Sequence, residues 1–140
     1  MMIKTIAQFI SIGLTALLLT GCGPAKRKVD ENYSVIKRIT PKPPAVLHYN
    51  ERLNIQVKYN APKCNICSVF MQPRLEGKPV PHAMISISKP FKKAAGTAEY
   101  WITFTNDASI DAISFTMRDF ETRFEVDSYT QAVEAIWISK

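Results

Sequence analysis

Apolar and polar residues alternate most clearly in the C-terminal two thirds of the chain. In residues 53–59, LNIQVKY, every second residue is apolar, which predicts a strand with one buried and one solvent-facing side. Residues rich in Asn, Pro, Asp and Gly separate this run from similar ones. Those runs lie at 66–71, 83–88, 99–105 and 113–117, around Phe124 and Val126, and at 133–138. The pattern predicts an all-β fold, a single small β-sandwich of about seven strands over residues 45–140.

The C-terminal run is compatible with a second secondary structure. Between Tyr129 and Trp137 the spacing of Ala132, Val133, Ala135 and Ile136 would also suit a helix. The ending Ile136-Trp137-Ile138 consists of residues that favour strands. We therefore expect a strand, with a helix as the alternative.

The first 21 residues have the pattern of a secretory signal peptide. Lys4 supplies a positive charge, a mostly apolar stretch follows from Ile6 to Leu19, and no acidic residue precedes Asp30. The stretch is shorter than the roughly 20 apolar residues that a transmembrane helix needs. We expect residues 1–21 to be removed on export.

The end of this segment, Leu19-Thr20-Gly21-Cys22, resembles the lipobox of bacterial lipoproteins. The resemblance implies cleavage before Cys22 and a diacylglycerol on its sulfur. Apart from this covalent lipid, we expect the protein to carry no cofactor. Gly23 in the second mature position resembles an outer-membrane sorting signal. The expected location is therefore the outer membrane, facing the periplasm, with the lipid as the membrane anchor.

Residues 22–44 are predicted to form the lipidated N-terminus and a basic tether. Pro41, Pro43 and Pro44 favour extended backbone, although Val35–Ile39 has the composition of an edge strand. Lys26-Arg27-Lys28 would attract anionic lipid headgroups beside the anchor, or would simply be a solvated linker. Both interpretations remain open.

The charge distribution argues against nucleic-acid binding. The formal net charge is +6, but Lys4 lies in the signal peptide, and residues 26–42 hold six basic and two acidic residues. Residues 43–140 hold 11 basic and 10 acidic residues, so the domain is almost neutral. We expect no nucleic acid among the partners.

Cys64 and Cys67 are the two cysteines that remain if Cys22 carries lipid. In an oxidising compartment such a pair is expected to form an intrachain disulfide. Two alternatives are a redox-active pair, and a soft-metal site completed by His82 with Met71 or Met84. We expect the structural disulfide and no metal, because the pair lies between two strand patterns.

Motifs for catalysis are not evident in the domain. Gly77 and Gly96 are its only glycines, which excludes a P-loop, a dinucleotide-binding fingerprint and a nucleophile elbow. We therefore expect no enzymatic activity. Basic and aromatic residues in one loop and the next strand are the candidate partner-binding residues: Lys89, Phe91, Lys92, Lys93 and Trp101.

The order of the strand patterns resembles the immunoglobulin-like sandwich modules of envelope proteins, which implies a fold and no activity. Our leading hypothesis is a non-enzymatic lipoprotein whose domain binds another envelope protein in an assembly, secretion-accessory, exclusion or immunity role. One alternative is a redox or metal-handling lipoprotein that uses Cys64 and Cys67. Another is a lipoprotein that binds a small molecule, a glycan or an enzyme that it inhibits.

Overall fold

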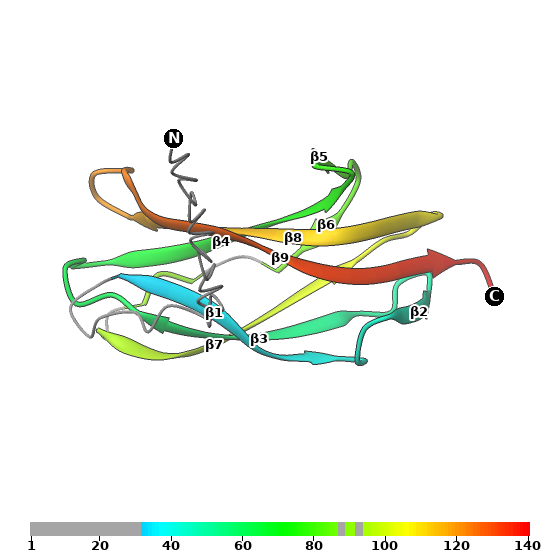
Figure 1. The fold of residues 1–140 in the computed structure, drawn as a ribbon, viewed down its shortest axis with the longest axis horizontal. Coiled ribbons are helices and arrows are strands. Elements are labelled where there is room, and N and C mark those ends of the chain that lie inside the picture. Colours follow the sequence, from blue (N-terminus) through cyan, green and yellow to red (C-terminus); the bar gives the residue numbers. More distant parts are fainter. Residues whose placement is uncertain (1–31, 87–88, 92–93) are drawn as a thin grey trace, which may run out of the picture.

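The computed structural model describes residues 32–86, 89–91 and 94–140 and shows two packed β-sheets (Figure 1). The expected cleavage site and Cys22 lie outside these residues. The strands are β1 (Tyr33–Thr40), β2 (Ala45–His48), β3 (Leu53–Asn60), β4 (Cys67–Leu75), β5 (Lys78–Pro79), β6 (Met84–Ile85), β7 (Ala95–Thr103), β8 (Ala108–Asp119) and β9 (Glu125–Ile138).

The strand order is that of an immunoglobulin-like sandwich. One sheet has the order β1-β3-β7-β6 and the other β2-β9-β8-β4-β5. In immunoglobulin domains the first, second, fifth and fourth strands form one sheet, and the third, sixth and seventh form the other. Here β1, β3, β7 and β6 correspond to the first group and β4, β8 and β9 to the second. The short strand β2 adds to the second sheet by pairing in parallel with β9. The predicted fold class is confirmed.

The sandwich begins at residue 33, earlier than the predicted boundary at residue 45. Residues 33–40, placed by the sequence in the tether with a possible strand over Val35–Ile39, form β1 and pair antiparallel with β3. The chain then crosses to the other sheet through Pro41, Pro43 and Pro44, whose missing N–H groups cannot extend a sheet ladder. The segment between Cys22 and the domain therefore ends near Asn32.

The C-terminal segment is one long strand. The two separate strands expected around Phe124 and at 133–138 are replaced by β9, and the helix alternative is wrong. Pairing with β8 continues across two irregularities, one between Ile110 and Ala112 and one between Met117 and Arg118. Each irregularity absorbs an extra residue of β9 and keeps the apolar residues on the inner face. Among the described residues, no helix is long and apolar enough to cross a membrane.

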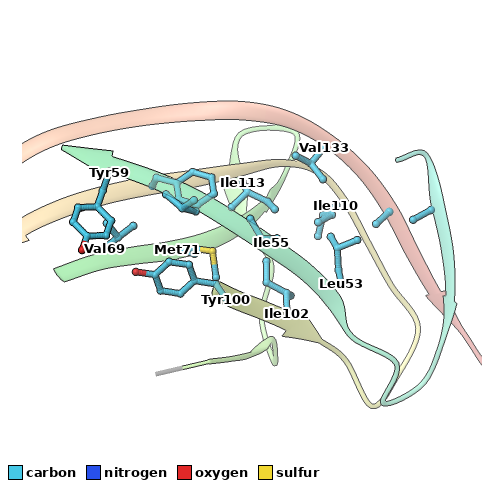
Figure 2. Packing of buried hydrophobic residues seen from close by; sticks show 14 of the residues in the cluster. Leu53, Ile55, Tyr59, Val69, Met71, Tyr100, Ile102, Ile110, Ile113 and Val133 are labelled. Atoms are coloured by element: carbon cyan, nitrogen blue, oxygen red, sulfur yellow. The ribbon is translucent and has the colours of Figure 1, made fainter. Parts of the chain in front are cut away.

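The core lies between the sheets and is built from alternate residues of the strands (Figure 2). In β3 the residues Leu53, Ile55, Val57 and Tyr59 are all buried. Their inward positions face residues of β4, β8 and β9 such as Val69, Ile113 and Val133. Predicted inward residues of β7 and the loop after it, Tyr100, Ile102 and Phe104, are buried as well. The apolar residues that recur at every second position in the sequence of these strands are thus the residues that are buried.

Trp137 closes the core at the end of β9. Its ring lies 4.8 Å from that of Phe104, and it has no exposed surface. The indole Nε1 donates to the carbonyl oxygen of Glu51 at 3.0 Å, and the Thr103 hydroxyl donates to the same oxygen at 2.6 Å. A buried indole needs such a partner. These bonds fix the β2–β3 loop against both sheets.

Two substitutions in β3 test this assignment of faces. Ile55→Ala should lower the free energy of unfolding by about 2–5 kcal/mol, because Ile55 is fully buried. Lys58→Ala on the exposed side of the same strand should change it by less than about 0.5 kcal/mol. Urea denaturation followed by circular dichroism measures both. Equal effects of the two substitutions would contradict the assignment.

Candidate functional site

The predicted disulfide between Cys64 and Cys67 is present at the corner between β3 and β4. The two Cα atoms are 5.8 Å apart. Cys67 is the first residue of β4, has 1% of its surface exposed and pairs with Asp119 of β8. It also forms an isolated bridge with Phe91, whose backbone N–H donates to the Cys67 carbonyl at 2.8 Å. The bond therefore joins a loop to a strand that is paired on both sides.

This position suits a structural cross-link better than redox chemistry. A reactive cysteine pair needs an accessible thiolate, which a helix N-terminus commonly stabilises. Here the pair lies between two strands, and Cys67 is buried. His82 lies in an exposed turn between β5 and β6. In the part of the chain that the structure describes, no group of three or more His, Cys, Asp or Glu side chains is placed to hold a metal ion.

The turn from Asp119 to Phe124, between β8 and β9, packs against the disulfide loop. The backbone N–H of Phe120 donates to the Ile66 carbonyl at 2.7 Å. Within the turn, the N–H of Asp119 donates to the carbonyl of Phe124, and the N–H of Arg123 donates to the carbonyl of Asp119. The turn is thus closed by its own backbone and fastened to the loop that the disulfide constrains.

The carboxylate of Asp119 organises the same turn. Its Oδ1 accepts the backbone N–H groups of Glu121 at 2.9 Å and Thr122 at 3.0 Å. The bond from Thr122, followed by that from Glu121, lowers the pKa of the Asp119 carboxyl, while desolvation opposes the shift. Its Oδ2 lies 3.4 Å from the sulfur of Cys64. Asp119 therefore connects the turn to the disulfide.

Two phenylalanines project from this fastened turn. Phe120 has 47% and Phe124 73% of its surface exposed, the latter the largest exposure among the large apolar residues that the structure describes. The Arg123 guanidinium lies over the Phe120 ring at 5.6 Å from its centroid. Phe124 was predicted to belong to a strand, but it precedes β9 and lies in the turn. Exposed aromatic side chains on a rigid turn are candidates for contact with another apolar surface.

The described chain enters the sandwich at this same end. The Asn32 side chain accepts the backbone N–H of Lys63, in the disulfide loop, at 3.3 Å. The N–H of Ser34 donates to the carboxylate of Asp127, near the start of β9, at 3.2 Å. Figure 1 shows the start of β1, the β3–β4 loop and the β8–β9 turn together at one end. We call this the disulfide end, and the opposite end, where β9 finishes, the far end.

The far end carries a different apolar surface on the outside of the five-stranded sheet. Val46 of β2 pairs with Ile136 of β9, and Ile138 follows two residues later on the same side. Val46 has 64%, Ile136 39% and Ile138 40% of its surface exposed. We call these three residues the far-end patch. Its neighbours on the outer face are Ser109, which pairs with Ile136, and the exposed Glu134, two residues before Ile136 in β9.

The structure separates the candidate partner-binding residues predicted from the sequence. Lys89 and Trp101 line one hollow of about 690 Å³ beside β7, with Glu99 also on its wall. The Trp101 ring is covered on one side by the Arg52 guanidinium, 4.2 Å from its centroid. The hollow is open to solvent, whereas a small-molecule or glycan site encloses most of its ligand.

Phe91, by contrast, is part of the packing. Its ring stacks on that of Tyr59 with centroids 3.8 Å apart, and its backbone is bridged to Cys67. Burial raises the pKa of the Tyr59 hydroxyl, in keeping with the apolar surroundings of this pair. Lys92 and Lys93 lie outside the described residues.

Sequence reasoning overlooked the exposed apolar residues at both ends. Residues 119–125, DFETRFE, contain two phenylalanines in a polar turn, a combination that burial does not explain. That signal was available. The far-end patch could not be predicted from the sequence, because it depends on the parallel pairing of β2 with β9, whose residues are about ninety positions apart.

Comparison with solved structures shows a likeness in fold. No protein-family model matches the chain, and no curated protein matches it either. A crystal structure of the periplasmic chaperone SfaE is similar with a TM-score of 0.42 and 8% sequence identity. The match covers 78% of this chain and 57% of the chaperone chain. A likeness at this level carries no argument about function.

The role of Asp119 can be tested through pH. Because its pKa is lowered in the folded protein, the unfolded chain takes up the proton first as pH falls. The stabilisation is thus present above about pH 4 and is lost as pH falls through the lowered folded pKa. Asp119→Ala should be less stable than the unsubstituted protein at neutral pH, and this difference should shrink in acid.

Urea denaturation between pH 7 and pH 2 measures the difference. Glu121→Ala, which removes an exposed carboxylate from the same turn, is the matched control and should leave the pH dependence unchanged. A stability difference for Asp119→Ala that is constant over this range would show that the carboxylate charge plays no part.

Proposed function

We propose that the protein is a lipoprotein of the outer membrane, facing the periplasm, whose immunoglobulin-like domain binds another envelope protein and catalyses no reaction. The anchor is the lipid on Cys22, supported by the lipobox at residues 19–22. The disulfide between Cys64 and Cys67 supports an oxidising compartment. The binding role rests chiefly on the far-end patch.

The far-end patch has the properties of a protein-binding surface. Val46, Ile136 and Ile138 are stiff β-branched side chains, so little conformational entropy is lost when a partner covers them. The small residue Ser109, paired with Ile136, allows close approach of a second surface, and Glu134 adds an exposed carboxylate at the margin of the patch. The patch also includes Val46 of β2, a four-residue strand that pairs on one side with β9 and forms the edge of the sheet on the other. An apolar partner surface of another envelope protein fits this edge.

The anchor is tested first. Mass spectrometry of the membrane-extracted protein should find Cys22 as the modified N-terminal residue. Cys22→Ser should move the protein from the membrane fraction to the soluble fraction or prevent its processing. An unmodified chain that retains Met1 would contradict the anchor.

The binding surface is tested by crosslinking in intact cells. A photoreactive amino acid at position 46 should form an adduct with a second envelope protein. Ile136→Asp should reduce the yield of this adduct roughly tenfold, because burying an unpaired carboxylate weakens binding by more than about 1.4 kcal/mol. The matched control is Val35→Asp, since Val35 is an apolar residue of the other sheet with 42% exposure. Adducts between two copies of this chain, or an equal effect of Val35→Asp, would contradict the assignment.

A further inference from the structure

The tether is short, and it meets the domain at one particular end. Asn32 follows Cys22 by ten residues. Ten residues span at most about 35 Å when fully extended and roughly 18 Å as a flexible coil. Because Asn32 contacts Lys63 in the disulfide loop, the tether fastens to the disulfide end. A lipid on Cys22 would therefore keep this end nearer to the bilayer than the far end.

The same end carries the exposed phenylalanines. Phe120 and Phe124 project from the turn that Asp119 and the Ile66 carbonyl hold in place. Because the turn is already ordered, it loses little further conformational entropy when its side chains contact a lipid bilayer. Two aromatic side chains alone bind a bilayer weakly, but a short tether makes their contact intramolecular and raises the effective concentration of the surface.

We infer that the disulfide end lies on the bilayer, with Phe120 and Phe124 inserted at the boundary between the lipid headgroups and the acyl chains. This inference rests on the proposed lipid anchor at Cys22. Phe120 and Phe124 thus contact the same membrane that holds the lipid anchor. The far-end patch points away from this membrane and stays accessible to a protein partner.

The charges of the turn indicate that its contact with the bilayer does not require anionic lipids. Glu121 and Glu125 flank the phenylalanines and are exposed, whereas Arg123 lies over the Phe120 ring. Acidic side chains beside the insertion point give no attraction to anionic headgroups. Insertion therefore depends on the aromatic side chains and should occur on zwitterionic vesicles.

Fluorescence quenching by brominated lipid tests the insertion directly. The full mature chain, carrying F124W, is reconstituted through its own anchor into phosphatidylcholine vesicles with or without brominated acyl chains. L75W is the matched control, because Leu75 is 41% exposed at the other end of β4, eight residues and on the order of 27 Å beyond Cys67. Trp101 and Trp137 give the same background in both chains.

The expected result is a loss of emission from F124W on brominated vesicles that L75W does not show. F120W is a second probe of the same turn and should also be quenched. Urea denaturation establishes that each variant is folded, which these exposed positions permit.

The outcomes separate this inference from the anchor. Mass spectrometry of the same sample reports the lipid on Cys22, and a chain without it overturns the anchor and the inference together. A lipidated chain in which neither F124W nor F120W is quenched overturns the inference alone. Equal quenching of L75W overturns it as well, since the domain would then have no preferred end on the bilayer. Crosslinking of position 124 to another protein, without quenching, would assign the turn to that protein instead.

Discussion

The antiparallel pairing of β1 with β3 determines at which end of the sandwich the N-terminal segment joins the domain. The ladder runs from Tyr33 opposite Asn60 to Thr40 opposite Asn54, so it includes the first strand residue of the described chain. A strand paired in this way cannot serve as flexible tether, and a slip of one residue would turn its side chains to the wrong face. The pairing therefore limits the proposed tether to the residues before 33 and fixes the end at which the described chain begins.

The two ends of the sandwich consequently have different environments. The disulfide end combines the start of the described chain at Asn32, the cross-link between Cys64 and Cys67, and a turn ordered by Asp119. The far end holds three exposed β-branched side chains on the outer face of the five-stranded sheet. Along β9, which has 14 residues, the ends are on the order of 45 Å apart. A membrane at one end and a protein at the other could thus be bound at the same time.

Local sequence patterns predicted the parts of the fold whose burial is periodic. The alternation in β3 and the apolar positions of β7 correspond directly to buried residues, and the cysteine pair was predicted to form the bond that it forms. The all-β class followed from these runs. The number of strands was less accurate. β1 was placed in the tether, β2 and β5 are too short for a period to be recognised, and two expected strands form the single strand β9.

The features that matter most for function depend on long-range pairing. Phe124 and Val126 have the spacing of a strand, but the irregular pairing near Arg118 leaves Phe124 in the turn. The basic and aromatic loop chosen from the sequence contains Phe91, which is partly buried and stacks on Tyr59 at the margin of the core. Which aromatic residues remain exposed is decided by the register between distant strands, and residue type alone does not contain that information.

Neutron reflectometry of the lipidated protein on a supported phosphatidylcholine bilayer tests the central claim, that the tether holds the disulfide end against the membrane. With the disulfide end on the membrane, the protein layer should be on the order of 45 Å thick and should begin at the headgroups, with no intervening layer of water. A water layer as wide as the tether allows, or a protein layer only as thick as the two stacked sheets, would contradict it.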